Sequence, residues 1–359
     1  MPTGNPRVSV LGLFPQFGEG HLGGIQASAS VAWQAVSDRS SAELLVYSRN
    51  NGHGAASVGA NSSRLGAIRT ALHRKDGADL LLVWQIGLIK LLPFLRHDKG
   101  KIALFLHGIE AWKKQDLLTR RLTRKVDLFL SNSDYTWSRF LSHNPELSGA
   151  RHQTVPLGIG EPRTNLVPPP RSRPAALMLS RLSRAEDYKG HREVIDAWPL
   201  VLRLQPEAEL WIAGTGDLRA ELEQMVRTRG LTGSIRFLGA ISEQQKEDLL
   251  QQSRCLLMPS RGEGFGLVYL EAMRAGRPCL VSNEDAGREV VNPPQAGLAV
   301  DPRDREGLST AINRLLSNGA EWQQWSERAR SRYEADYTAR QFQQRLAEAL
   351  FGNSKQTNV

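Results

Sequence analysis

The sequence predicts an α/β protein built from two doubly wound domains that face each other across a cleft. Short apolar runs alternate with amphipathic stretches along the chain, which is the pattern of parallel strands joined by crossover helices. One stretch without periodicity, residues 160–174, holds five prolines and is interpreted as the linker between the domains. The 359 residues are enough for two domains of ordinary size.

In the first half, apolar runs predict strands at 8–13, 44–47, 80–84, 102–106, 128–131 and 154–156. Helical patterns follow at 24–36 and 133–142. The long apolar run 80–95 is interrupted by Gln85, Lys90 and Pro93. We therefore interpret it as a strand, a turn and an apolar helix, and not as a membrane span.

In the second half, strands are expected at 176–179, 209–213, 235–238, 255–258, 278–281 and 298–300. Helices are expected at 192–204, 218–229, 243–252, 267–275 and 305–316, and the tail 320–351 reads as helical with a break near 337–338. The expected domains are 1–165 and 170–335, followed by a C-terminal helix, 336–352, that crosses back to the first domain.

The composition indicates an anionic partner. The net charge is +9, and a basic run with interleaved leucines extends from Lys113 to Lys125. That run fits a solvated helix face, or a surface that docks on anionic lipid or on a phosphate-linked acceptor. No zinc-finger spacing or aromatic RNA-binding strand is present, so nucleic acid is not an expected partner.

Two features bear on the compartment. Cys255 and Cys279 lie in apolar runs and are expected to be buried, reduced thiols, which favours a cytoplasmic location. The first apolar run, 8–14, is too short for a signal peptide and is followed by Pro15.

The segment 260–276 carries the most informative motif. Glu263 lies in a loop that follows a strand, and Glu271 lies about one turn into the next helix, with a Gly-Phe-Gly turn between them. The helix N-terminus attracts anions, and carboxylates accept hydrogen bonds from hydroxyls. A nucleotide sugar, with hydroxyls at both ends and phosphates between, fits this arrangement. A glycoside hydrolase would also use paired carboxylates, but the cations described next argue against it.

A basic segment follows the strand at 176–179. Arg181 lies at the strand's carboxyl end, and Lys189 is expected at the start of a helix that begins around Gly190. Two cations at a strand end can neutralise a diphosphate and stabilise it as a leaving group. A solvated basic loop is the alternative.

Two further candidates lie in the first half. Gly23 and Gly24 stand between a strand and a helix, where glycine lets the backbone approach a phosphate, although a Gly pair also makes an ordinary turn. His107 directly follows the strand 102–106 and could be catalytic or structural, and Glu110 and Trp112 of the same loop could line the acceptor side.

Other signatures are weak or missing. The Gly-Thr-Gly at 214–216 lacks the third glycine of a dinucleotide fingerprint. No Walker A loop, zinc-ligand spacing, Asp-x-Asp pair or Gly-x-Ser-x-Gly elbow occurs. The sequence therefore predicts neither a metal nor a cofactor.

With these motifs in the same order, the chain resembles the retaining glycosyltransferases of family 4, which belong to glycosyl transferases group 1 and have the GT-B double-Rossmann fold. The resemblance extends from Val8 to about Gly352, and its most specific part is the pair Glu263 and Glu271. The insert 182–188 between Arg181 and Lys189 is longer than in many members.

The resemblance implies a role for each candidate residue. Arg181 and Lys189 would bind the donor diphosphate, Glu271 the ribose, and Glu263 the transferred sugar. His107 would lie beside the donor sugar. The remaining donor-site residues would contact the phosphates, or the base in the case of Leu238: Gly23, Gly24, Leu238, Gly264, Phe265, Gly266 and Leu267.

The implied activity is metal-independent transfer, with retention, from a UDP- or GDP-sugar to the hydroxyl of a sugar, lipid-linked or polysaccharide acceptor. The implied location is cytoplasmic, with peripheral attachment to the inner face of an anionic membrane as an option. Three alternatives stay open: a GT-B nucleotide-sugar epimerase, a pyridoxal-phosphate phosphorylase, and a non-catalytic protein that binds membrane or nucleic acid.

Overall fold

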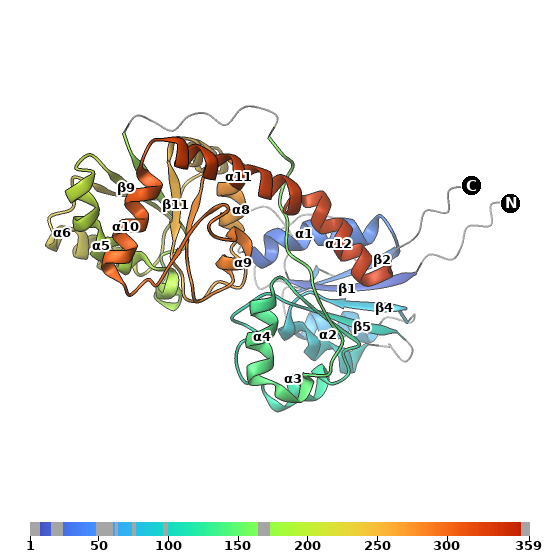
Figure 1. Cartoon of the computed structure of the whole chain (residues 1–359). Coiled ribbons are helices and arrows are strands. Elements are labelled where there is room, and N and C mark those ends of the chain that lie inside the picture. Colours follow the sequence, from blue (N-terminus) through green and yellow to red (C-terminus); the bar gives the residue numbers. More distant parts are fainter. Residues whose placement is uncertain are drawn as a thin grey trace, which may run out of the picture. The chain divides into compact units, whose positions relative to one another are not determined.

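The computed structural model describes residues 8–15, 24–47, 60–61, 64–73, 77–95, 100–163 and 173–352. The chain divides into two compact units, each built on one parallel sheet (Figure 1). Unit 1 comprises Met1–Ile159 and Ala339–Val359, and unit 2 comprises Gly160–Thr338. The predicted linker begins at this division, and its residues 164–172 lie outside the described part of the chain.

Unit 1 contains a seven-stranded sheet in the order β3-β2-β1-β4-β5-β6-β7. Its strands are β1 (Ser9–Pro15), β2 (Ser41–Tyr47), β3 (Ala60–Asn61), β4 (Leu80–Val83), β5 (Lys101–Leu106), β6 (Leu128–Ser131) and β7 (His152–Thr154). Its helices are α1 (Gly24–Ser37), α2 (Arg64–His73), α3 (Leu117–Thr123), α4 (Asp134–His143) and α12 (Ala339–Phe351), with 3-10 helices η1 (Ile86–Phe94) and η2 (Pro145–Leu147).

The core of unit 1 is formed by strands that are apolar on both faces, because helices cover both faces of a parallel sheet. All four residues of β4 are buried. Trp84, at the end of β4, stacks on Phe14 at a ring distance of 5.2 Å and packs against Phe105 at 4.4 Å. Phe342 of α12 lies 6.3 Å from the same ring, so the C-terminal helix packs in unit 1, beside α1 (Figure 1).

Unit 2 contains a six-stranded parallel sheet in the order β10-β9-β8-β11-β12-β13. Its strands are β8 (Ala175–Leu179), β9 (Glu209–Ala213), β10 (Ile235–Gly239), β11 (Cys255–Met258), β12 (Cys279–Ser282) and β13 (Gly297–Val300). Its helices are η3 (Arg184–Lys189, 3-10), α5 (His191–Leu204), α6 (Arg219–Thr228), α7 (Glu243–Gln252), α8 (Leu267–Arg274), α9 (Gly287–Val291), α10 (Arg305–Leu316) and α11 (Ala320–Asp336).

The strand order of unit 2 defines a switch point. The chain runs from β8 outward through β9 to β10, then returns to place β11 on the other side of β8. The connections after β8 and β11 therefore leave the sheet in opposite directions. In an open doubly wound sheet, ligands bind at the carboxyl ends of the two strands on either side of such a point.

Local signals explain where several helices of unit 2 start. Ser242 and Gln245 form a reciprocal capping box at the start of α7, and Asp304 accepts the N–H of Gly307 at the start of α10.

The buried face of α5 places Val194, Trp198 and neighbouring residues in the core of the unit.

Most predicted elements are present, with ends that shift by a few residues. The apolar segment after β4 is a 3-10 helix, η1, with Pro93 inside it. Five of the described elements have no counterpart among the predicted ranges: β3, α2, η2, η3 and α9. Four of them, β3, η2, η3 and α9, contain two, three, six and five residues, too few to show a period. The fifth, α2, has ten residues but only a weak amphipathic pattern. Within the described residues, no helix is long and apolar enough to cross a membrane.

Candidate active site

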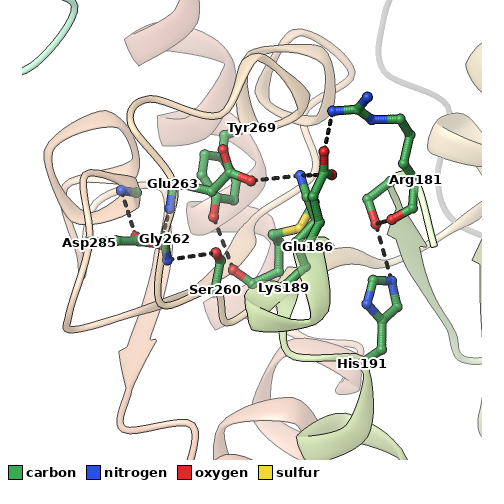
Figure 2. A network of polar contacts seen from close by, with 12 residues as sticks. Arg181, Glu186, Lys189, His191, Ser260, Gly262, Glu263, Tyr269 and Asp285 are labelled. Carbon is green, nitrogen blue, oxygen red and sulfur yellow. Dashed lines mark hydrogen bonds and ion pairs between the residues drawn. The ribbon is translucent and has the colours of Figure 1, made fainter. Parts of the chain in front are cut away.

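The predicted donor residues of unit 2 gather at its switch point. Arg181 and Lys189 come from the connection after β8, and Glu263 comes from the connection after β11, the neighbouring strand. Figure 2 shows the side chains of Lys189 and Glu263 directed toward each other, with Glu186 between Lys189 and Arg181. The fold thus brings together groups that are up to 82 positions apart in the sequence, from 181 to 263.

Lys189 is the centre of this cluster. Its Nζ donates to Glu263 Oε1 at 2.8 Å and lies 3.5 Å from Glu186 Oε2. Each of the three side chains is only 15 % exposed. Burial opposes the charged form of Lys189, but the two carboxylates outweigh it, so the pKa of Lys189 lies above its usual value.

The place of Lys189 in the chain differs from the prediction. It is the last residue of the 3-10 helix η3 and does not start α5, which begins at His191 after the left-handed residue Gly190 (φ 85°). A Cβ at position 190 would lie 2.8 Å from the carbonyl oxygen of Pro259, so glycine is required for this close approach. The long insert 182–188 therefore folds as a compact turn that still delivers Lys189 to Glu263.

Arg181 is the accessible cation of the cluster. Its side chain is 72 % exposed and forms an ion pair with Glu186. Sequence reasoning missed Glu186, which contacts both predicted phosphate-binding cations. The sequence signal that could have identified Glu186 is its position, as an acidic residue, between Arg181 and Lys189.

Glu271 has a different partner. It lies on α8, is 25 % exposed, and its Oε1 accepts from Lys246 Nζ of α7 at 2.6 Å. Lys246 also pairs with the exposed Glu243 at 2.7 Å. Burial raises the pKa of the Glu271 carboxyl, while the Lys246 ammonium acts in the opposite direction. Sequence reasoning did not single out Lys246, because it lies 25 residues from Glu271 in the chain.

The Gly-Phe-Gly turn starts α8. Gly266 is the N-cap residue with φ 83°, a left-handed conformation that favours glycine, and a Cβ there would lie 2.4 Å from the ring of Tyr269. Gly264 and Phe265 are buried, and Leu267 is half-buried. The positive end of the helix dipole lies at this turn, which suits a phosphate.

The Gly-Thr-Gly segment has a structural explanation. Gly214 and Gly216 have φ values of 138° and 154°, and a Cβ would come within 1.8 Å of the carbonyl oxygen of Ser180 and 2.1 Å of that of Leu182. The N–H of Leu182 donates to the carbonyl of Thr215 at 2.9 Å. These glycines let the loop after β9 support the loop that carries Arg181.

The site residues predicted from the first half lie in unit 1. His107 is 6 % exposed, and its Nε2 donates to the carbonyl of Trp84 at 2.7 Å. Burial lowers the pKa of His107 to about 3, so the ring is neutral at neutral pH. One oxygen of Glu110 accepts the N–H groups of His107 at 2.8 Å and Gly108 at 3.2 Å, and burial raises the pKa of this carboxyl.

The remaining predicted residues are placed as follows. Trp112 packs edge-on against Tyr135 at 5.3 Å. Gly24 is the first residue of α1, whereas Gly23 lies outside the described residues. Leu238 is half-buried in β10. The roles expected for these residues stay predictions.

Two further observations concern metal-binding side chains and cysteine thiols. Among the residues that the structure describes, no group of three or more His, Cys, Asp or Glu side chains could hold a metal ion. Cys255 and Cys279 are free and fully buried, as expected, and burial raises the pKa of the Cys255 thiol.

Comparison with known proteins identifies the class. Residues 169–332 match the family model described as glycosyl transferases group 1. The glycogen synthase of Mycobacterium tuberculosis is 30 % identical over 239 residues, which cover 66 % of this chain and 55 % of that protein. The phosphatidyl-myo-inositol mannosyltransferase of Mycobacterium leprae is 32 % identical over 180 residues, or 48 % of this chain and 46 % of that protein. The chain thus spans about half the length of these two relatives.

A solved structure matches almost the whole chain. The Anabaena protein HepE, in complex with UDP and glucose, superimposes with a TM-score of 0.74 at 20 % identity, covering 96 % of this chain and 99 % of that one. Two units, each built on one doubly wound parallel sheet, together with this structural match show the GT-B fold. Residues 169–332, which make up most of unit 2, thus match glycosyl transferases group 1, and the chain is similar over part of its length to sugar-transferring enzymes.

Proposed function

We propose that this protein is a retaining, family 4 enzyme that moves a sugar from a nucleoside-diphosphate sugar to an acceptor hydroxyl. The observation that carries the proposal is the cluster at the carboxyl ends of β8 and β11. There the fold assembles an exposed arginine, a largely buried lysine that is 15 % exposed, and a carboxylate beside the N-terminus of α8. This is where a doubly wound sheet binds its ligand, and the charges suit a diphosphate joined to a sugar.

In this reaction the bond between the sugar's anomeric carbon and the diphosphate oxygen breaks, and a bond to the acceptor oxygen forms on the same face. The acceptor's proton passes to the departing phosphate. Arg181 and Lys189 would stabilise the charge that grows on the leaving diphosphate. Glu263 would hold hydroxyls of the transferred sugar, and Glu271 those of the ribose. Because two side-chain cations supply the counter-charge, we propose that no metal ion is needed.

The proposed donor is a UDP- or GDP-sugar, which the likeness to a fold that holds UDP and glucose supports. The proposed acceptor is a sugar, lipid-linked or polysaccharide hydroxyl in glycan or glycolipid synthesis. Leu117 and Leu118 of α3 are 83 % and 49 % exposed, and Arg121 and Arg124 beside them are exposed. An exposed apolar pair among cations favours a peripheral site on an anionic, cytoplasmic membrane face.

The donor site is tested first by binding. Thermal unfolding of the purified chain with UDP, GDP, ADP and UMP should show a rise in midpoint for one diphosphate, because a ligand that binds the folded state stabilises it by mass action. The effect should persist in EDTA. A panel in which no nucleotide shifts the midpoint would refute the proposal.

The reaction is tested next with donors of the nucleotide that binds. NMR of the product should show the donor's anomeric configuration. Inverted product would refute retention, and a released sugar with an altered ring centre, formed without acceptor, would indicate an epimerase. Arg181→Ala should lower turnover strongly while Arg184→Ala, at an exposed arginine that pairs with Glu221, serves as the matched control.

Membrane attachment is tested separately. Vesicles of phosphatidylglycerol should sediment the protein and vesicles of phosphatidylcholine should not. The double variant Leu117→Gln, Leu118→Gln should lose sedimentation and keep nucleotide binding. Equal sedimentation of wild type and variant would contradict the role of this helix.

A further inference from the structure

Asp285 joins the loop that carries Glu263 to the connection after the next strand. It follows β12 and is only 4 % exposed. Its Oδ2 accepts the backbone N–H of Glu263 at 2.9 Å, and its Oδ1 accepts the N–H of Gly287 at 2.9 Å. The N–H of Ala286 donates in return to the Glu263 carbonyl at 3.2 Å. Both backbone polar groups of Glu263 are therefore held by the segment 285–286.

The same carboxylate reaches the start of the loop. The Ser260 hydroxyl hydrogen-bonds to Asp285, and Ser260 Oγ also accepts the N–H of Gly262 at 3.1 Å. Figure 2 shows Ser260, Gly262, Glu263 and Asp285 in one connected network. The loop between β11 and α8 is thus fixed by hydrogen bonds that lead back to one carboxyl group.

The surroundings of Asp285 are poor in positive charge. The groups that face it are the Glu263 carboxylate and the Tyr269 phenol of α8, whose O–H donates to the carbonyl of Met258 at 2.9 Å. Among the described residues, no Lys, Arg or His forms an ion pair with Asp285 within 4 Å. A buried carboxylate without a cation is unfavourable for stability and is kept only where its hydrogen bonds are used.

We propose that Asp285 is the positioning residue of the donor site, which fixes the backbone at Glu263 so that its carboxylate meets Lys189 and the transferred sugar. The inference rests on the proposed function for the identity of the ligand, but not for the hydrogen bonds themselves. Asp285 does not touch the sugar. It acts through the two backbone groups of Glu263.

This arrangement predicts a pH dependence. Burial raises the pKa of Asp285 to about 7, and the charge on Glu263 adds to the effect. The protonated carboxyl carries an O–H and accepts the two backbone N–H groups less strongly. Positioning of Glu263 should therefore weaken as the pH falls through about 7. The effect on folding stability has the opposite sign. Because the pKa of Asp285 in the folded protein lies above its unfolded value of 3.8, this group stabilises the fold below pH 3.8. That contribution is lost as the pH rises through about 7.

The test compares wild type with Asp285→Asn, which keeps the shape but loses one acceptor. The matched control is Asp301→Asn after β13. Asp301 is half-exposed, and its Oδ1 accepts the backbone N–H of Arg303 at 2.9 Å and lies 3.0 Å from the Arg303 side chain. We expect Asp285→Asn to lower kcat by about 10- to 100-fold, with a much smaller change in the donor KM, because a misplaced contact acts mainly on the transition state. The fall in kcat on the acid side of pH 7, expected for the wild type, should vanish in Asp285→Asn. The control Asp301→Asn should change neither kcat nor its pH profile.

Amide hydrogen exchange provides a readout that does not need activity. Exchange in the segment 259–266 should become at least about tenfold faster in Asp285→Asn and stay unchanged in the control. An unchanged pH profile, or unchanged exchange in this segment, would overturn the inference. If Asp285→Asn does not fold, Ser260→Ala weakens the same network and should shift both readouts in the same direction. A different outcome separates the two proposals. If exchange is faster in Asp285→Asn but the wild-type protein binds no nucleotide, the proposed function is overturned, and with it the donor role of the network.

Discussion

Replacement of Lys189 by methionine tests the cluster on which the functional argument depends. The change keeps the length of the side chain and removes the charge, which leaves the carboxylates of Glu263 and Glu186 facing each other. In the wild type these lie 2.8 Å and 3.5 Å from the ammonium, and all three side chains are 15 % exposed. Little solvent is available to screen the charges that remain.

The magnitude follows from the geometry. Two unit charges about 4 Å apart interact by about 4 kcal/mol at an effective dielectric constant of about 20. Removal of one partner of a buried ion pair costs about 3–5 kcal/mol, because the other charge stays buried without compensation. Since each side chain keeps some exposure, we expect Lys189→Met to lower the free energy of unfolding by about 2–4 kcal/mol. Adding Glu263→Gln should recover part of this loss.

The assay is urea unfolding of the full chain, followed by circular dichroism, for both single variants and the double variant. The double-mutant cycle isolates the coupling between Lys189 and Glu263. Lys90→Met is the matched control, because Lys90 lies 2.7 Å from Asp116 in a pair whose side chains are 46 % and 52 % exposed. That variant should leave the unfolding midpoint unchanged.

Binding completes this prediction. Loss of a charge-assisted hydrogen bond costs about 1.5–3 kcal/mol, so the Kd of the nucleoside diphosphate, measured by titration calorimetry, should rise by about tenfold or more. A Lys189→Met protein with wild-type stability and wild-type nucleotide affinity would refute the reasoning. Lost stability with unchanged affinity would leave the cluster as a structural feature only.

Three further predictions concern other charged and titratable side chains. Glu186→Gln should lower the Kd for the nucleoside diphosphate several-fold in calorimetry, because Glu186 competes with phosphate for two cations; weaker binding would show that it orients them instead. Lys246→Met should reduce the preference for a ribonucleotide over its 2′-deoxy analogue, because Lys246 holds Glu271 at 2.6 Å, and an unchanged ratio of Kd values would contradict this. Acid should destabilise the chain through His107 and His191, whose pKa values burial lowers to about 3 and about 4. Because these pKa values are lower in the folded protein than the unfolded value near 6.5, the two histidines stabilise the fold above pH 6.5, and this contribution is lost as the pH falls. The midpoint of thermal unfolding should therefore decline below pH 6.5, and His191→Gln should reduce the decline.

The sequence by itself determined the class of fold and indicated the chain positions of the charged residues that form the candidate site. Both depend on local patterns. The apolar runs at 255–258 and 209–213 coincide with β11 and β9, and the glycines at 264 and 266 mark the turn that opens α8. A residue at the end of a parallel strand must emerge at one edge of the sheet, so Arg181 and Glu263 could be assigned to that edge from the sequence.

Only the tertiary structure decided which groups meet. Lys189 and Glu263 are 74 residues apart, Lys246 and Glu271 are 25 apart, and Glu263 and Asp285 are 22 apart. Side-chain periods of 2 and 3.6 residues place a residue on a face of its own element, but they carry no information on which loop of a neighbouring strand it faces. The ion-pair partners and the buried carboxylate therefore follow from strand order and loop packing, which place chain-distant charges beside one another.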